Sequence, residues 1–453
     1  MGILGGIMVP HPPLIVSEIG RGKENEIRNT IAAYEKAVHF LNELNPETII
    51  LITPHAKSYG DYFKIYDGDT YGDFRMFGAK EVSFNIDYDK EFINELSKEI
   101  ETLPGGLDGD LDDSLDHATM VPLYFINKSL KNYKIVRVAL SGLSKPLHYK
   151  LGIYIQKVAD KLNKRVAVVA SGDLSHRLTE DGPYGFSKEA PIYDEKIMDD
   201  MSSGNFINLL NYDEDFLENA GICGHRGFCI MAGTFDKKKL EIEKLSYEGP
   251  FGVGYGVCTY KVVGNDESKN YYDIWEENRL NEIKEIRNKE DKYVQLARKA
   301  VEEYIKNNNV IDVNDEDNTR KATFVSIHKN GELRGCIGTV SPMTKNVYHE
   351  IISNAISAAT KDNRFPKIRE NELPFLDYSV DILEPSEITT KDKLNPKKYG
   401  IIVEKGFNRG VLLPDLDGVD TVDEQITIAL KKAGLNPNEE DYIIKRFVVV
   451  RHF

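Results

Sequence analysis

Residues 165–176 read RVAVVASGDLSH, a run of apolar residues that ends in a polar segment. A second apolar run, residues 48–53 (TIILIT), ends at a proline. Continuous apolar strands of this kind are typical of a parallel sheet covered on both faces. Residues 24–44 and 147–162 have the apolar spacing of the covering helices. The first half of the chain is therefore predicted to be an α/β domain with a mainly parallel sheet.

Several predicted strands end in chemically reactive residues. In an open α/β sheet, ligands bind beyond the carboxyl ends of the strands, where neighbouring loops converge. A proline ends two of these strands because it has no N–H for the ladder, and a histidine follows each proline. The shared position predicts one site for the four histidines that lie beside strand ends or helix starts: His11, His55, His117 and His176.

A metal ion explains this histidine cluster best, because neutral imidazole is the commonest metal ligand. We predict His11 and His55 as two of the ligands. For the third ligand the sequence offers Cys223, His225 and Glu248, of which we favour Cys223. A thiolate would bind firmly and neutralise charge, whereas a carboxylate would suit ferrous iron and oxygen chemistry. Iron(II) is the expected metal, with zinc and copper as alternatives.

Asp173 and His176 lie three residues apart at the end of a predicted strand. This spacing suits a histidine that transfers protons and is oriented by a carboxylate. The alternative is that Asp173 caps the segment that follows it.

Five motifs together resemble the class III extradiol dioxygenase superfamily over residues 1–263: PHPP, PHA, LDHATMVPLYFI, SGDLSH and SYEGPFGVGYG. The resemblance implies that His11 and His55 bind the metal, that His117 faces the substrate and that His176 is the acid/base group. The motif ICGHR is closer to the Memo branch, which has a cysteine, here Cys223, where the dioxygenases have a glutamate. A thiolate changes the charge and the oxygen reactivity of iron, so ring cleavage is implied by the superfamily alone.

The second half of the chain has a different pattern of predicted strands and helices. After a polar linker at residues 264–284, hairpins and flanking helices predict an α+β domain over residues 285–453. Three motifs resemble the AMMECR domain: LRGCIGT, DNRFP and GFNRGVLLP. No established reaction accompanies this domain. In bacteria and archaea the two domains occur with a radical SAM protein, in the AmmeMemoRadiSam system, and the resemblance therefore implies a radical SAM partner.

Each of these three motifs contains an arginine: Arg334, Arg364 and Arg409. Guanidinium groups suit carboxylates and phosphates, so we predict that the three line one cleft for an anionic small molecule or an acidic peptide segment. The alternative is that they pair with acids such as Asp362, Asp377 or Asp381 and connect loops. Cys336 could be a nucleophile at the floor of the cleft, but we assign it to packing, since free cysteine is often buried.

Composition excludes several classes of protein. Lys and Arg number 58 against 73 Asp and Glu, a net charge of −15, which argues against nucleic-acid binding and against docking on anionic lipid. Four cysteines in 453 residues do not form a disulfide framework. No apolar stretch approaches the ~18 residues of a membrane helix. We expect a cytoplasmic protein.

The leading hypothesis is a metal-dependent, dioxygenase-like or redox enzyme that acts on a small molecule, aromatic or anionic. The alternative is a non-enzymatic metal-binding adaptor that serves a radical SAM partner. Thiol chemistry at Cys223 and Cys336 is a third, weaker hypothesis.

Overall fold

The computed structural model describes residues 2–68, 71–107, 114–313, 318–416 and 418–453. The chain forms two compact units, one ending at Trp275 and the other beginning at Glu276, with separate hydrophobic cores. Helix α9 (Tyr271–Lys289) spans the boundary between them. The segment 264–284, predicted to be a linker, contains the end of strand β10, a short 3-10 helix and the first part of α9.

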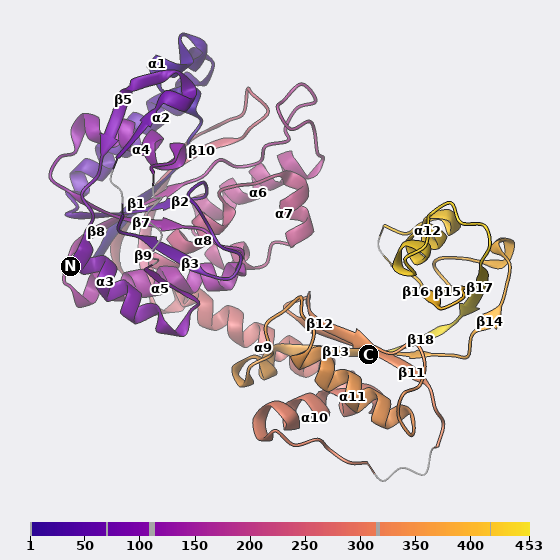
Figure 1. Cartoon of the computed structure of the whole chain (residues 1–453). Helices are drawn as coiled ribbons and strands as arrows, with labels where there is room; N and C mark the ends of the chain where they lie inside the picture. The colour runs from indigo at the N-terminus through magenta and orange to yellow at the C-terminus, as the bar shows by residue number, and fades with distance from the viewer. Residues whose placement is uncertain (1, 69–70, 108–113, 314–317, 417) are drawn as a thin grey trace. The chain divides into compact units, whose positions relative to one another are not determined.

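The first unit is built on one large sheet (Figure 1). Four central strands run parallel because each is followed by a helical crossover, whereas the two strands beyond β1 pair antiparallel. The α/β prediction is confirmed. In sheet order, the strands are β6 (Gly105–Leu107), β3 (Phe63–Tyr66), β7 (Lys134–Ala139), β2 (Thr48–Thr53), β8 (Arg165–Ser171), β1 (Gly2–Val9), β10 (Tyr255–Asn265) and β9 (Lys238–Glu248).

Helices cover both faces of this sheet. Helices α2 (Arg28–Leu44) and α4 (His117–Ser129) pack together on one face, and α5 (Lys145–Lys161) and α8 (His225–Thr234) pack together on the other. Gly152 and Gly233 allow α5 and α8 to approach closely, because a Cβ at either position would overlap the backbone of the other helix. The remaining elements of this unit are α1 (Ser17–Gly20), β4 (Tyr71–Phe74), β5 (Ala79–Asn85), α3 (Lys90–Glu99), α6 (Glu189–Ser203) and α7 (Glu214–Ala220).

The second unit contains two four-stranded antiparallel sheets. The first has the order β12 (Glu332–Gly338), β11 (Ala322–Lys329), β13 (Leu376–Leu383) and β18 (Val449–His452). The second has the order β14 (Glu387–Ile388), β17 (Ile443–Phe447), β15 (Gly400–Lys405) and β16 (Asn408–Leu412). Helices α10 (Lys292–Asn307) and α11 (Val347–Thr360) pack on the first sheet, and α12 (Val422–Lys432) packs on the second. The α+β prediction is confirmed.

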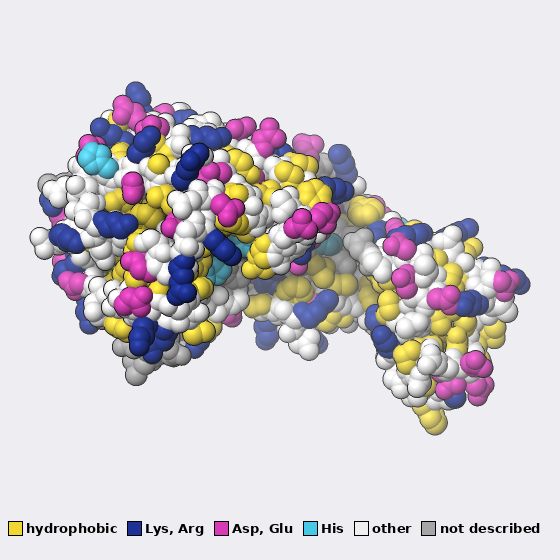
Figure 2. Space-filling view, turned by 90° about the horizontal axis from the view of Figure 1, so that it is seen from above, with side chains coloured by type: hydrophobic (Ala, Val, Ile, Leu, Met, Phe, Trp, Pro, Cys, Tyr) yellow, Lys and Arg dark blue, Asp and Glu magenta, His cyan; other side chains and the backbone are white. Residues whose placement is uncertain are grey.

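The surface carries charges of both signs. On the face shown in Figure 2, basic and acidic side chains are interspersed among apolar and uncharged groups. Among the described residues, no helix combines the length and the apolar character that spanning a bilayer requires.

Candidate metal centre

The ends of three neighbouring parallel strands bring the predicted site residues together. β8 lies between β1 and β2, and Val9 pairs in register with Ser171. His11 and His55 therefore follow adjacent positions at one edge of the sheet, as expected for parallel strands. His117, the first residue of α4, completes the cluster. The ring centroids of His11, His55 and His117 lie 4.6 to 5.4 Å from one another.

Three donor atoms of this cluster converge on one point. His11 Nε2 lies 3.0 Å from His55 Nε2 and 3.7 Å from Cys223 Sγ. The donor atoms of all three residues lie within 4.8 Å of one another. The His11 side chain is buried, Cys223 is half-buried and His55 is exposed, so the centre is open to solvent on the side of His55.

The orientation of His11 is set by its neighbours. Its Nδ1 lies 3.0 Å from the hydroxyl of Ser171, the last residue of β8, and its backbone N–H donates to Asp173 Oδ1 at 2.8 Å. A partner at Nδ1 fixes the ring and leaves Nε2 directed at the centre, the arrangement in which histidine commonly binds metals. The lone pair of Nε2 is thus positioned for a ligand.

A buried ion pair lies beneath the other two histidines. Arg137 from β7 donates to Asp116 Oδ2 at 2.8 Å, and both side chains are nearly inaccessible to solvent. Asp116 caps α4 by accepting the Thr119 N–H, and it also accepts the hydroxyl of Thr53. The Thr53 hydroxyl accepts the N–H of His55 at 3.3 Å. One carboxylate therefore connects the segments that carry His55 and His117.

This ion pair was not predicted, although the sequence carries signals for it. Arg137 is a charged residue inside the apolar run KIVRVAL, and a buried charge requires a partner. Asp116 directly precedes a helical pattern, where aspartate is a preferred N-cap. Burial alone would raise the pKa of Asp116, but Arg137 and the hydrogen bonds from Thr53 and Thr119 hold it below its usual value.

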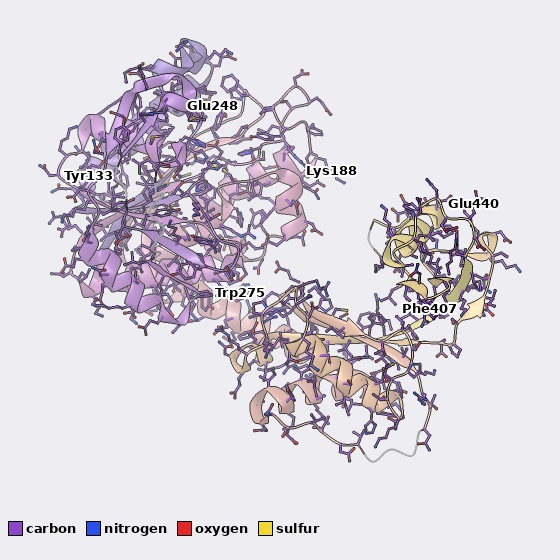
Figure 3. The ribbon with its side chains drawn as sticks, in the orientation of Figure 1. Tyr133, Lys188, Glu248, Trp275, Phe407 and Glu440 are labelled. Atoms are coloured by element: carbon purple, nitrogen blue, oxygen red, sulfur yellow. The ribbon has the colours of Figure 1, made fainter. Side chains whose placement is uncertain are left out.

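Of the three candidates for the third ligand, Cys223 alone joins the two histidines. His225 is fully buried, with Nε2 2.9 Å from the carbonyl oxygen of Leu209. Glu248, labelled in Figure 3, accepts the N–H and the hydroxyl of Thr30 at the start of α2, each at 2.7 Å. His225 and Glu248 thus have structural partners away from the centre.

The expected pairing of Asp173 with His176 takes a different form. The two side chains approach Cys223, with ligand atoms within 4.8 Å of one another. In the described part of the chain, however, no hydrogen bond joins the carboxylate to His176, because Asp173 accepts the His11 amide instead. His176 stacks on Tyr184 at 5.3 Å, and its Nε2 is buried without a hydrogen-bond partner among those residues.

The imidazoles at the centre are neutral at physiological pH. Burial, and then the nearby His55, lowers the pKa of His117 and of His176 to about 4. Burial, then the neighbouring histidines, lowers the pKa of His11 well below its usual value. Burial, then the charge of Asp173, raises the pKa of the Cys223 thiol. Burial also raises the pKa of Asp173 to about 7. A cation bound at the centre would interact favourably with the lone pairs of these uncharged imidazole nitrogens.

In the second unit, each of the three arginines that were predicted to line an anion-binding cleft has a carboxylate partner. Arg334 forms a two-pronged pair with Glu372 at 3.0 Å, Arg364 pairs with Asp362 at 2.7 Å, and Arg409 lies 3.3 Å from Glu404. The pairing that the sequence left as the alternative is therefore the one observed, although of the acids named only Asp362 is a partner. Asp381 pairs with Arg451, and Asp377 lies 3.9 Å from Arg279.

Cys336 lies in β12, within the motif LRGCIGT. Its backbone N–H donates to Asp362 at 2.9 Å, and its thiol accepts the hydroxyl of Ser326 at 3.2 Å. The backbone carbonyl of Cys336 also accepts from Arg364 at 3.3 Å. These contacts tie Cys336 into the strand and the loop beside it.

Comparison with known proteins agrees with the two units. The family described as catalytic LigB subunit of aromatic ring-opening dioxygenase matches residues 5–258, and the family described as AMMECR1 matches residues 294–452. A protein of Clostridium acetobutylicum is 40% identical over 468 residues, which cover 100% of this chain and 99% of that protein.

Two further relatives match about a third of the chain. A protein of Thermotoga maritima is 47% identical over 170 residues, 36% of this chain and 98% of that protein. A solved structure from Pyrococcus horikoshii is 31% identical and covers 35% of this chain and 88% of its own, with a TM-score of 0.33. The relative from C. acetobutylicum, by contrast, extends over both units.

Proposed function

Because this chain belongs to the family of the catalytic LigB subunit of aromatic ring-opening dioxygenases and also carries an AMMECR1 domain, we propose that its first unit is an iron(II)-dependent, dioxygenase-like oxidoreductase acting on a small molecule. The observation that carries the proposal is the convergence of His11, His55 and Cys223 at the strand ends. The family predicted from the sequence motifs is confirmed.

The three donors fit a metal ion in both chemistry and spacing. Two imidazole nitrogens, each about 2.1 Å from one ion and at right angles, would lie about 3.0 Å apart. The nitrogens of His11 and His55 lie 3.0 Å apart. A thiolate at about 2.3 Å and a nitrogen at about 2.1 Å would lie roughly 3.1 to 3.6 Å apart. Cys223 Sγ lies 3.7 Å from His11 Nε2, so only a small adjustment is needed.

The remaining residues of the site have roles that follow from their contacts. When bound, iron(II) would supply Lewis acidity and one-electron redox chemistry. His176 is neutral, and its unpaired Nε2 can accept a proton from a substrate hydroxyl at that atom. His117 lies beside His55 and can hold a substrate oxygen by a hydrogen bond.

Aromatic side chains at the rim favour a planar apolar substrate. Phe77 packs edge-on against His117 at 5.6 Å, and Tyr184 stacks on His176 at 5.3 Å. Both rings are exposed, with 38% and 61% of their surface accessible. A planar ring between them would gain the stacking and edge contacts that aromatic groups prefer.

The experiment is anaerobic purification of the full chain, metal analysis, and measurement of oxygen consumption with substituted catechols. We expect about one iron per chain, and its loss in a variant that combines His11→Ala with His55→Ala. His39→Ala is the matched control, since His39 is an exposed histidine of α2 that contacts Glu43. Full metal occupancy in the double variant would refute the site.

One observation favours a second function. By the resemblance of the sequence motifs, the thiol of Cys223 takes the place of the carboxylate of the dioxygenases, and a thiolate alters the oxygen reactivity of iron. The second candidate is therefore a metal-binding adaptor without turnover, acting with a radical SAM partner. Iron-loaded protein that consumes no oxygen with any of the catechols, yet binds such a partner, would favour it.

A further inference from the structure

The second unit contains a pocket whose lining residues lie mostly outside the three predicted motifs. It has a volume of about 240 Å³ and lies where the two sheets of this unit meet. Its walls come from the start of β11, the loop after β12, the end of β13 and strands β15 to β17. By volume it has room for about eight water-sized groups, since a water molecule occupies roughly 30 Å³.

Two arginines reach the pocket and are held on adjacent residues of one loop. Arg320 donates from Nη2 to the carbonyl oxygen of Pro342 at 2.9 Å and from Nε to that of Thr344 at 3.0 Å. Arg409, from β16 in the other sheet, donates from Nη1 to the hydroxyl of Ser341 at 3.1 Å. Both guanidinium groups line the same pocket.

Among the residues that the structure describes, the charges at the pocket are not balanced. Lys321 also lines it and is neutralised by Glu384 at 2.6 Å, and Arg409 lies 3.3 Å from Glu404. Among the described residues, no carboxylate lies within 4.0 Å of Arg320. Arg320 therefore carries a positive charge without a described counter-ion, which an anion bound in the pocket would balance.

Each guanidinium group also has one terminal nitrogen that makes no described hydrogen bond. Within the part of the chain that the structure describes, Nη1 of Arg320 and Nη2 of Arg409 have no hydrogen-bond partner. The lining also includes the apolar residues Leu383, Ile402 and Phe447, together with Glu384, whose carboxylate pairs with Lys321. Two guanidinium groups and these apolar side chains in one pocket define the complementary ligand.

We propose that this pocket binds a small organic acid, with its carboxylate held by Arg320 and Arg409 and a compact apolar body against Ile402 and Phe447. The planar guanidinium fork matches a carboxylate, and two such forks can share its two oxygens. The ligand would contact both sheets of the unit. This inference goes beyond the proposed function and does not depend on the metal centre.

The test is calorimetric titration of the full chain with three probes: benzoate, benzamide and inorganic phosphate. Benzoate has a carboxylate and an apolar ring within the size of the pocket, and benzamide lacks only the charge. A hydrogen bond to a charged group contributes about 1.5 to 3 kcal/mol, which is roughly a 10- to 100-fold change in affinity. We expect benzoate to bind at least 10-fold more tightly than benzamide and than phosphate.

Three variants locate the binding. Arg320→Gln and Arg409→Gln should each weaken benzoate at least 10-fold. Arg446→Gln is the matched control, because Arg446 lies in β17 of the same sheet, pairs with Glu387 and does not line the pocket. It should change the affinity less than twofold. Thermal unfolding of each variant establishes that the fold is retained.

Several results would overturn the proposal. Absence of benzoate binding at 10 mM, on the order of the weakest specific affinities, would reject the site. Equal binding of benzoate and benzamide would reject the role of charge. Wild-type affinity in Arg320→Gln or Arg409→Gln would place the ligand elsewhere. Phosphate binding as tight as that of benzoate would reject the organic acid and leave a bare anion site.

Discussion

Replacement of Arg137 by methionine tests the support beneath the candidate metal centre. Arg137 is 1% exposed and donates to Asp116 Oδ2 at 2.8 Å and to the carbonyl oxygen of Ser114 at 3.2 Å. Methionine fills much of the same volume and removes the charge. Breaking a buried ion pair by removing one partner costs about 3 to 5 kcal/mol, because the other charge stays buried without compensation. We expect the free energy of unfolding to fall by that amount.

The loss should depend on pH in a defined direction. In the wild type the pKa of Asp116 lies below its usual value, so its contribution to stability is present at neutral pH and is lost as the pH falls through that lowered pKa. Without Arg137, burial would raise the pKa of Asp116 above its unfolded value, and stability would then fall as the pH rises through the raised pKa. The deficit of Arg137→Met should therefore be larger at pH 8 than at pH 5.

Urea unfolding of the full chain at both pH values measures the effect. Arg165→Met is the matched control, since Arg165 is a half-exposed strand residue 3.2 Å from Glu47, and such pairs contribute at most about 1 kcal/mol. Adding Asp116→Asn to Arg137→Met removes the stranded charge and keeps an effective N-cap, so part of the stability should return. A deficit below about 1 kcal/mol, or no recovery in the double variant, would refute the role of the ion pair.

Three other outcomes are expected. His176→Ala should keep its metal and lose turnover if the metal binds at His11, His55 and Cys223 and not at the second group of potential ligands, Asp173, His176 and Cys223; metal analysis with an oxygen assay checks this, and loss of the metal would show that the role is misassigned. Burial raises the pKa of Asp194 to about 6, so its contribution to the free energy of unfolding falls as the pH rises from about 4 to 6. In Asp194→Asn the free energy of unfolding should fall by about 3 kcal/mol less over this pH range, and an unchanged pH profile of unfolding would contradict this. Gly233→Val should lower the free energy of unfolding by at least about 2 kcal/mol by separating α5 and α8, whereas Gly264→Ala, with open space around it, should have little effect; equal unfolding midpoints for the two variants would be the contrary result.

The central sheet could be predicted because its strands are buried on both faces. In β2 every residue from Ile49 to Ile52 is fully buried, so the apolar run is continuous and unambiguous. Strand β9 was not predicted, because its sequence KKLEIEKLSYE is charged and it lies at the edge of the sheet with most side chains half-exposed or exposed. An edge strand that is largely exposed lacks the apolar run from which buried strands are predicted.

The sequence favoured Cys223 as the third ligand but could not exclude His225, because the two are only two residues apart. The start of α8 at His225 decides between them: it turns the imidazole into the core beside Leu209 and leaves the thiol facing His11. Glu248 was a candidate by residue type, but its carboxylate is occupied by Thr30. The local direction of the backbone, which composition does not encode, thus places the Cys223 thiol, and not the His225 imidazole, beside His11.

The arginines of the second unit illustrate a different limit. Arg364 pairs with Asp362, two residues away, and that partner was named from the sequence. Glu372, the partner of Arg334, is 38 residues distant and lies in a 3-10 helix, Glu370–Phe375, which the tertiary fold brings close to Arg334. Carboxylates are frequent in a chain with 73 of them, so charge alone could not select the right one.

The candidate metal centre is costly to maintain unless it binds something. Of the three imidazoles, whose ring centroids lie within 5.4 Å of one another, His11 is buried and His117 is half-buried, and burial lowers the pKa of both at the expense of their hydration. A core selected only for stability would place aliphatic side chains at such positions, since residues that conflict with packing rules concentrate at functional sites. The Asp116–Arg137 pair adds a second costly element that holds the segments of His55 and His117 in place. The histidine cluster and the Asp116–Arg137 ion pair both lower the stability of the fold, and both position the same donor atoms. A bound cation would account for the presence of both.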